Sequence, residues 1–195
     1  MSIKQTVAPT LDAVTLDEIK AQCGADGYDD YDSLLAGLRD RATEAVGKQS
    51  KRQIMSATFT LSLDCFPAEI VIDLIPVSAI SSIAYTDSNG TAQTLTAVTD
   101  YQTDLSTYDG PARIKPAYGT SWPSTISDTY GAVVVTFVAG YTTTALVPKT
   151  IKHEICMMTA HWFAQREGVV VGTTASAIPA GLEMLAALND SGAYQ

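Results

Sequence analysis

The pair His153-Glu154 is the arrangement in this sequence closest to a zinc-peptidase motif. Such a motif needs a second histidine four residues after the first, so that both imidazoles bind one metal from the same helix face. Position 157 is Met157, and His161 lies about two helical turns beyond His153. We therefore expect no metal site here, and we interpret both histidines as surface or interface residues.

Three acidic residues lie close together at Asp29, Asp30 and Asp32. A calcium-binding EF-hand loop would need a glycine at its sixth position and a glutamate at its twelfth. Neither requirement is met when the loop is started at Asp26 or at Asp30. We interpret Asp29, Asp30, Asp32 and Ser33 as N-cap candidates of a helix.

The cysteines Cys23, Cys65 and Cys156 are far apart and show no CxxC spacing, so neither a disulfide framework nor a zinc site is expected. We expect buried free thiols in a reducing compartment, and a structural thiol at Cys156. The sequence contains no GxxxxGK[ST], GxGxxG or GxSxG motif. It therefore predicts no catalytic residues, no metal, no cofactor and no enzymatic activity.

The charge balance is acidic, with a formal net charge of −9, and only 17% of the 195 residues are charged. DNA-binding proteins cluster lysine and arginine, and only residues 48–52 approach this, which we interpret as a solvated helix end. Sequence-specific DNA binding is excluded, although an acidic surface suits a channel through which DNA slides. The first residues lack a signal-peptide pattern and no apolar run reaches about 20 residues, so we expect a soluble cytoplasmic protein without a membrane span.

Two helices are predicted before residue 50. Thr15 and Glu18 fit a capping box that opens a helix over about 15–23, which Gly24 ends. A second helix is expected to reach about Gln49. Its predicted buried face consists of Leu34, Leu38 and Ala45, flanked by Leu35, Ala42 and Val46. The polar residues expected largely outside this face are Arg39, Asp40, Glu44 and Lys48.

From Ile54 onward the hydrophobic period changes from about 3.6 to 2. Strict alternation at 58–65 predicts a half-buried strand. Further strands are predicted at 70–75, 80–86, 91–95, 101–105, 112–115 and 132–139, and Asn89-Gly90 predicts a hairpin turn at 87–90. Short strands at such spacing indicate an antiparallel sandwich or open barrel.

The helical period returns after Gly140, and Pro148 suits the first turn of a helix that ends at Gly168. Its core-facing stripe is expected to consist of Ile151, Ile155, Met158 and Trp162. A second, smaller-sided face carries His153, Met157, Ala160 and Ala164, which we expect to contact a neighbouring subunit. Residues 169–177 are predicted to form a loop, and about 180–188 a last helix.

Two further segments are candidate contact regions. The aromatic residues Tyr118 and Trp122 lie in a proline-rich loop, where they either form a contact surface or fold back over one end of the sheet. The tail 189–195 has no core-forming pattern and is either simply disordered or a segment that orders on binding a partner.

The predicted fold class is α+β, with a helical bundle built from N- and C-terminal helices and an inserted antiparallel β-sandwich or open barrel. The expected organisation is N-terminal helices at 1–53, a β-rich insertion at 54–140 and C-terminal helices at 141–188 that complete the bundle. A flexible tail is expected at 189–195.

The order of motifs resembles the head–tail connector (adaptor) family of long-tailed double-stranded-DNA phages and related gene transfer agents. The resemblance runs from about Thr15 to Leu188. Its motifs are, in order, TEAV at 43–46, TFTLSLDCFP at 58–67, PARIKP at 111–116, SWP at 121–123, VTFVAGY at 135–141, VP at 147–148, AHWF at 160–163, RE at 166–167, IP at 178–179 and the leucine-containing end at 185–188.

The resemblance implies a structural virion subunit of the neck, assembled in the bacterial cytoplasm, with no active site and no cofactor. Such subunits form a ring, expected to be dodecameric, that docks beneath the portal protein after DNA packaging. The ring extends the DNA channel, through which DNA passes without sequence-specific binding, and supports the next neck (stopper) or tail-completion protein.

This chain departs from the family in its tail, which continues to Gln195. We expect portal or partner docking by tail residues Asn189, Asp190, Tyr194 and Gln195. Two alternatives stay open: another head- or tail-completion protein, and a small cytoplasmic hydrolase with a site made of Asp, His and Tyr on loops. Neighbouring portal and capsid genes would favour the virion components.

Overall fold

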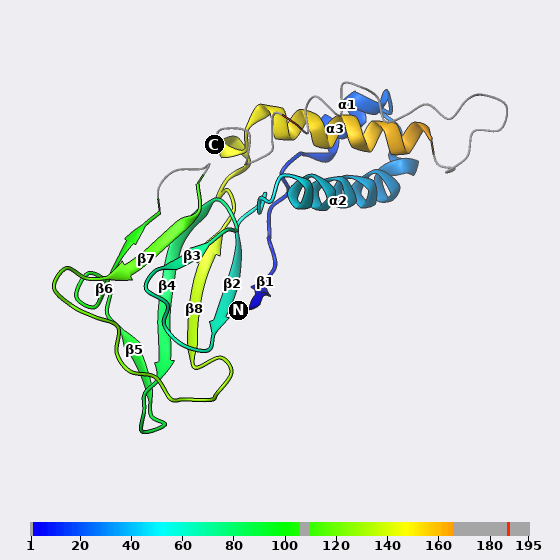
Figure 1. Cartoon of the computed structure of the whole chain (residues 1–195). Helices are drawn as coiled ribbons and strands as arrows, with labels where there is room; N and C mark the ends of the chain where they lie inside the picture. Colours follow the sequence, from blue (N-terminus) through cyan, green and yellow to red (C-terminus); the bar gives the residue numbers. More distant parts are fainter. Residues whose placement is uncertain (1, 106–109, 166–186, 188–195) are drawn as a thin grey trace. The chain divides into compact units, whose positions relative to one another are not determined.

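The computed structural model of the chain describes residues 2–105, 110–165 and 187. Its backbone divides into two compact units (Figure 1). We call Met1–Thr10 together with Met55–Tyr141 the β unit, and Leu11–Ile54 together with Thr142–Gln195 the helical unit. Helices that precede and follow the strands in sequence pack together, so the predicted α+β class is confirmed.

The β unit contains two antiparallel sheets, neither of which closes into a barrel. The strand order is β1-β2-β8-β4-β5 in the larger sheet and β3-β7-β6 in the smaller. The strands are β1 (Ser2–Val7), β2 (Ala57–Leu63), β3 (Ile70–Ile72), β4 (Val77–Thr86), β5 (Ala92–Leu95), β6 (Tyr101–Asp104), β7 (Ala112–Pro116) and β8 (Val133–Ala139).

Alternating side chains build the core of the β unit. Buried and half-buried residues alternate strictly along β2 and β8, as a strand with one face on a core requires. Phe59 lies opposite Phe137 in the β2–β8 pairing, and their rings stack at 5.7 Å between centroids. Ile70, Ile72 and Ile114 of the smaller sheet join the same cluster.

All the predicted strands are found, with shifted ends, but β1 was missed. All six β1 residues are exposed, so this strand has no buried face that would produce a hydrophobic alternation. The predicted hairpin turn is confirmed between β4 and β5. There one Asp87 carboxylate oxygen accepts the backbone N–H groups of Asn89 and Thr91, both at 2.9 Å, and Gly90 takes a φ of 81°.

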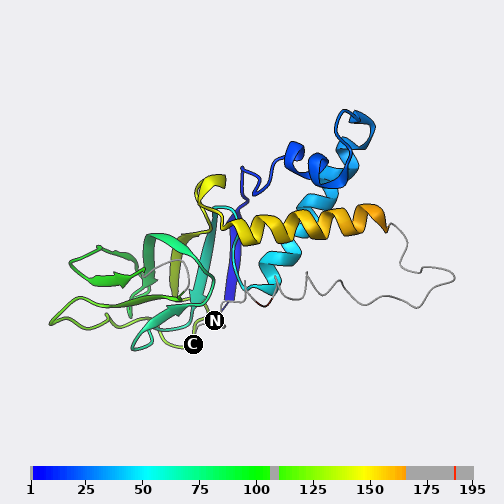
Figure 2. The same cartoon turned by 90° about the horizontal axis from the view of Figure 1, so that it is seen from above.

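The helical unit contains α1 (Leu16–Cys23), α2 (Asp32–Gln49) and α3 (Lys149–Ala164), with short 3₁₀ turns at Asp29–Tyr31 and Thr144–Leu146. Helices α2 and α3 lie side by side in Figure 1 and cross in Figure 2. The capping box is confirmed: the Glu18 N–H donates to Thr15 Oγ1 at 3.2 Å, and the Thr15 N–H donates to Glu18 Oε2 at 2.8 Å. Gly24 ends α1 in the left-handed conformation, as predicted.

The predicted N-cap of α2 is wrong. Tyr31 occupies the cap position, and Asp29 and Asp30 lie in a 3₁₀ turn before it. The carboxylates of Asp29 and Asp32 instead bind Lys20 Nζ. The hydrogen bonds that Lys20 donates to Asp32 and Asp29 raise the pKa of Lys20. The acidic cluster that the sequence suggested for capping therefore binds an ammonium group instead.

The buried face of α2 is rotated from the predicted one. Leu35, Leu38, Ala42 and Val46 are buried, whereas Leu34 is 39% exposed and Ala45 is half-buried. Arg39, expected outside the stripe, is buried. Its guanidinium pairs with Asp12 at 2.8 Å and with Asp40 at 2.9 Å and donates to the Val14 carbonyl oxygen at 3.4 Å. Charge pairing thus makes burial possible for a residue that polarity alone places in solvent.

Helix α3 begins directly after Pro148 and ends at Ala164, four residues before the predicted stop at Gly168. Ile151 and Ile155 are buried as predicted, but Glu154 and Thr159 take the next buried positions, while Met158 and Trp162 are half-buried. The predicted loop at 169–177 and tail at 189–195 lie outside the described residues. Of the predicted last helix the structure describes Ala187, which is helical.

Candidate contact surfaces

The proposed subunit face of α3 is present as a row of partly accessible side chains. His153 and Ala164 are exposed, and Met157 and Ala160 are half-buried. Gln22 Nε2 lies 3.7 Å from Met157 Sδ, so Met157 packs toward α1 within the helical unit. The part of this face open to another molecule is therefore centred on His153, Ala160 and Ala164.

The three cysteines are free thiols. Burial raises the pKa of Cys156 and of Cys23, and the nearby Glu18 carboxylate raises the pKa of Cys156 further. Both thiols therefore stay protonated near neutral pH, which is the unreactive form. Of the three thiols expected to be buried, Cys23 and Cys156 are half-buried, and the expectation is wrong for Cys65, which is exposed beyond the end of β2 at Leu63.

The described residues contain no cluster of three or more His, Cys, Asp or Glu side chains placed to hold a metal. No described helix has the length and apolar character that a membrane span requires. Lys48, in the basic stretch at 48–52, pairs with Glu44 at 2.6 Å near the end of α2, and that hydrogen bond lowers the pKa of Glu44. This pair reduces the positive charge that Lys48 offers to DNA phosphates.

The aromatic loop divides between the two alternatives that the sequence left open. Trp122 folds back against the core cluster of the β unit and stacks on Phe66, with 4.7 Å between ring centroids and 7° between planes. Phe66 in turn meets the ring of Tyr85 edge-on at 5.6 Å. Tyr118 is fully exposed and remains available for contact with a partner.

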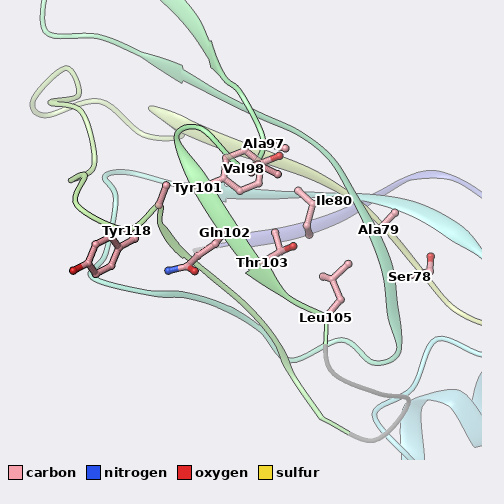
Figure 3. Close-up of a pocket in the computed structure, with 11 residues that line it drawn as sticks. Ser78, Ala79, Ile80, Ala97, Val98, Tyr101, Gln102, Thr103, Leu105 and Tyr118 are labelled. Carbon is pink, nitrogen blue, oxygen red and sulfur yellow. The ribbon is translucent and has the colours of Figure 1, made fainter.

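A pocket of about 600 Å³ lies in the β unit beside Tyr118. Figure 3 shows Ser78, Ala79 and Ile80 of β4 lining one side, and Gln102 and Thr103 of β6 together with Leu105 lining another. The remaining lining residues are Ala97, Val98, Tyr101, Ala117 and Tyr118. The lining is mainly apolar and contains no charged side chain.

Sequence reasoning missed this pocket and strand β1. The pocket lies where β5 stops pairing with β4. The alternation of apolar and polar residues within one strand does not reveal where that pairing stops. The exposed Ile3 and Val7 of β1 carry no alternation either. The signal that was available is the β-branched content of Ser2–Val7, a weak indicator of a strand.

No protein-family model matches the sequence, and no curated protein is significantly similar to it. The fold is nevertheless shared with solved structures of phage-like particles. A chain in the virion of a native gene transfer agent (GTA) particle matches with a TM-score of 0.77 and 18% identity, over 97% of this chain and 95% of that chain. A chain in the neck of the empty GTA particle, computed with C6 symmetry, matches with a TM-score of 0.76 at the same identity and coverage.

A chain in the neck of the native GTA particle, computed with C12 symmetry, also matches, with a TM-score of 0.69 and 18% identity. The match again covers 97% of this chain and 95% of that chain. At this identity the likeness establishes a common fold along nearly the whole of both chains.

Proposed function

We propose that this chain is a structural subunit of the neck of a tailed phage or gene transfer agent, in the position of a head–tail connector (adaptor). The observation that carries the proposal is the match to chains of GTA particles, two of them neck structures, over 97% of this chain. Because the match covers nearly the whole chain, both the β unit and the helical unit belong to the shared fold.

The subunits form a closed ring. The matched neck structures were computed with sixfold and twelvefold symmetry, which supports cyclic assembly and the dodecamer that the sequence resemblance implies. A closed ring needs a heterologous contact, in which two different faces of each subunit meet. We assign one of these faces to His153, Met157, Ala160 and Ala164 of α3.

The ring docks beneath the portal protein and supports the next neck (stopper) or tail-completion protein. Portal docking is assigned to Asn189, Asp190, Tyr194 and Gln195, which lie outside the described residues. Tyr118 is assigned to a loop contact because its side chain is fully exposed. Trp122 is not assigned to this contact, because its ring stacks on Phe66.

DNA passes through the ring without being bound by it. A net charge of −9 disfavours phosphate binding, and Lys48 of the basic stretch at 48–52 is paired with Glu44. The role is structural and not catalytic, which the matches to chains of the GTA virion and neck support.

Gold labelling of intact particles tests the proposal. A peptide tag inserted at the exposed β4–β5 turn, beside Asn89, provides an epitope on a functional full-length chain. We expect gold at the head–tail junction in electron micrographs. Label on the capsid surface or the tail tip would mean that the chain is another virion component and not the connector. Absence of the chain from particles would favour a cytoplasmic enzyme.

A further inference from the structure

Two edges of the larger sheet are open at opposite ends of the β unit. At one end lies β1, which pairs with β2 on one side and is an outermost strand of the sheet. At the other end, β4 pairs with β8 from Val77 to Tyr85, with register shifts between Val77 and Ala79 and between Ile80 and Ser82, whereas β5 pairs with β4 only from Ile83 to Thr86. The stretch of β4 from Ser78 to Ser82 therefore has an uncovered edge among the described residues.

The uncovered stretch of β4 borders the pocket of about 600 Å³. The opposite wall is β6, itself the outermost strand of the smaller sheet. One wall of the pocket thus carries the uncovered edge of β4, and backbone N–H and C=O groups on such an edge form hydrogen bonds readily with an added strand. Ile80 and Leu105 supply an apolar lining for the side chains of that strand (Figure 3).

The strand β1 has the properties of a matching partner. Ile3 lies opposite Leu61 of β2 and therefore on the same face of the sheet. Leu61 is fully buried, whereas Ile3 is 42% exposed, so an apolar side chain at this edge is left uncovered. Lys4, the one charged residue of β1, pairs with Thr60 and projects from the other face. With six residues, β1 is about 20 Å long, and the open stretch of β4 is about 17 Å long.

We infer that the outer edge of β1 in one copy adds to the open edge of β4 in the next copy, with Ile3 entering the pocket between β4 and β6. Within one copy β2 and β8 separate β1 from β4, so the occupant must come from a second copy. The contact joins two different surfaces of the same chain, and repeated head-to-tail contacts of this kind form a ring when the rotation between neighbours closes.

This inference rests on the proposed neck function, and cysteine cross-linking in assembled particles tests it. In a Cys65→Ser background, Ala79→Cys is combined in turn with Ile3→Cys, Lys4→Cys and Gln5→Cys. Paired antiparallel strands bring opposed Cα atoms to about 4.5–5.5 Å, which lies within the range of about 4.4–6.8 Å that disulfides span. We expect at least one combination to give an oxidation-dependent ladder of multimers. The single variants and the pair Ala79→Cys with Asn89→Cys stay monomeric on the same gel.

Incorporation into particles, measured on a reducing gel, separates the two claims. If the variants are incorporated and no combination forms multimers, the strand-addition contact is wrong and the neck role stands. If the unsubstituted chain is absent from particles, both fail. In a second arm, Ile3→Asp leaves the circular dichroism and thermal unfolding of the purified chain unchanged and lowers its incorporation at least about tenfold. Incorporation equal to that of Asn89→Asp would overturn the assignment of Ile3.

Discussion

The indole of Trp122 stacks face to face on the ring of Phe66, with 4.7 Å between their centroids. This contact fixes the proline-rich loop against the β-unit core, whereas Tyr118 in the same loop remains in solvent. Two aromatic residues that the sequence treats alike therefore differ in environment: Trp122 packs on the β-unit core, and Tyr118 is the residue proposed to contact a partner.

Replacing Trp122 with alanine should lower the free energy of unfolding by about 2 kcal/mol, since a half-buried aromatic residue loses less than a fully buried one. Trp122→Phe should lose less than half of that unfolding free energy, because its ring can still stack on Phe66. Urea unfolding followed by circular dichroism measures both values. Tyr118→Ala is the matched control, with a change within about 0.5 kcal/mol. A large loss at Tyr118 would mean that its side chain supports the fold.

Gly140, at the end of β8, is required by two constraints. Its φ is +105°, and a Cβ there would collide with the carbonyl group of Met55. We expect Gly140→Ala to cost at least about 2 kcal/mol of unfolding free energy, through backbone strain and the clash together. Gly90→Ala isolates the strain, because φ is +81° there and the space is open, and should cost about 1 kcal/mol. Equal losses at the two glycines would contradict the close approach to Met55.

The Asp87 turn should make stability depend on acid pH. Hydrogen bonds to the carboxylate, above all from the Thr91 backbone, lower the pKa of Asp87 in the folded protein. A lowered folded-state pKa gives stability that is fully present above the unfolded pKa near 4 and is lost as pH falls through the folded value. Asp87→Asn keeps acceptors for the turn but does not titrate.

The stability difference between the unsubstituted chain and the Asp87→Asn variant is therefore expected to be larger at pH 6 than at pH 3. Thermal unfolding of both proteins across this range, at constant ionic strength, measures it. A difference independent of pH would show that the carboxylate charge does not stabilise the turn.

Some features of the fold are determined by the local sequence pattern, and others by residues that are distant in sequence. The alternation of β2 and β8 and the Thr15–Glu18 cap were predicted correctly because the hydrophobic period and the hydrogen bonds of one segment decide them. Arg39 was placed wrongly because its burial depends on Asp12, far away in sequence. The pocket beside β6 was missed because it arises where one strand pairing stops.

The proposed α3 face should affect assembly and not folding. Ala164→Glu adds charge at an exposed position and should leave the thermal unfolding of the isolated chain within about 2 °C while reducing ring formation and incorporation into particles. Met157→Glu should also destabilise the chain, since Met157 contacts Gln22 of α1. Gln49→Glu, on the exposed end of α2, is the charge-matched control. Normal incorporation of Ala164→Glu would place the subunit contact elsewhere.

The tail assignment predicts a loss of docking without loss of fold. A chain truncated after Leu188 should keep the unfolding transition of the full chain and fail to co-purify with the portal protein of the same particle. Tyr194→Ala in the full-length chain tests the one large side chain of that segment with a minimal change. Undiminished portal binding by the truncated chain would remove 189–195 from the interface.

Deletion of the gene, followed by electron microscopy of the particles produced, tests the neck assignment most directly. We expect DNA-filled or leaking heads alongside unattached tails, and we expect joined particles again when the full-length chain is supplied from a plasmid. Particles with heads and tails normally joined in the absence of the chain would contradict it.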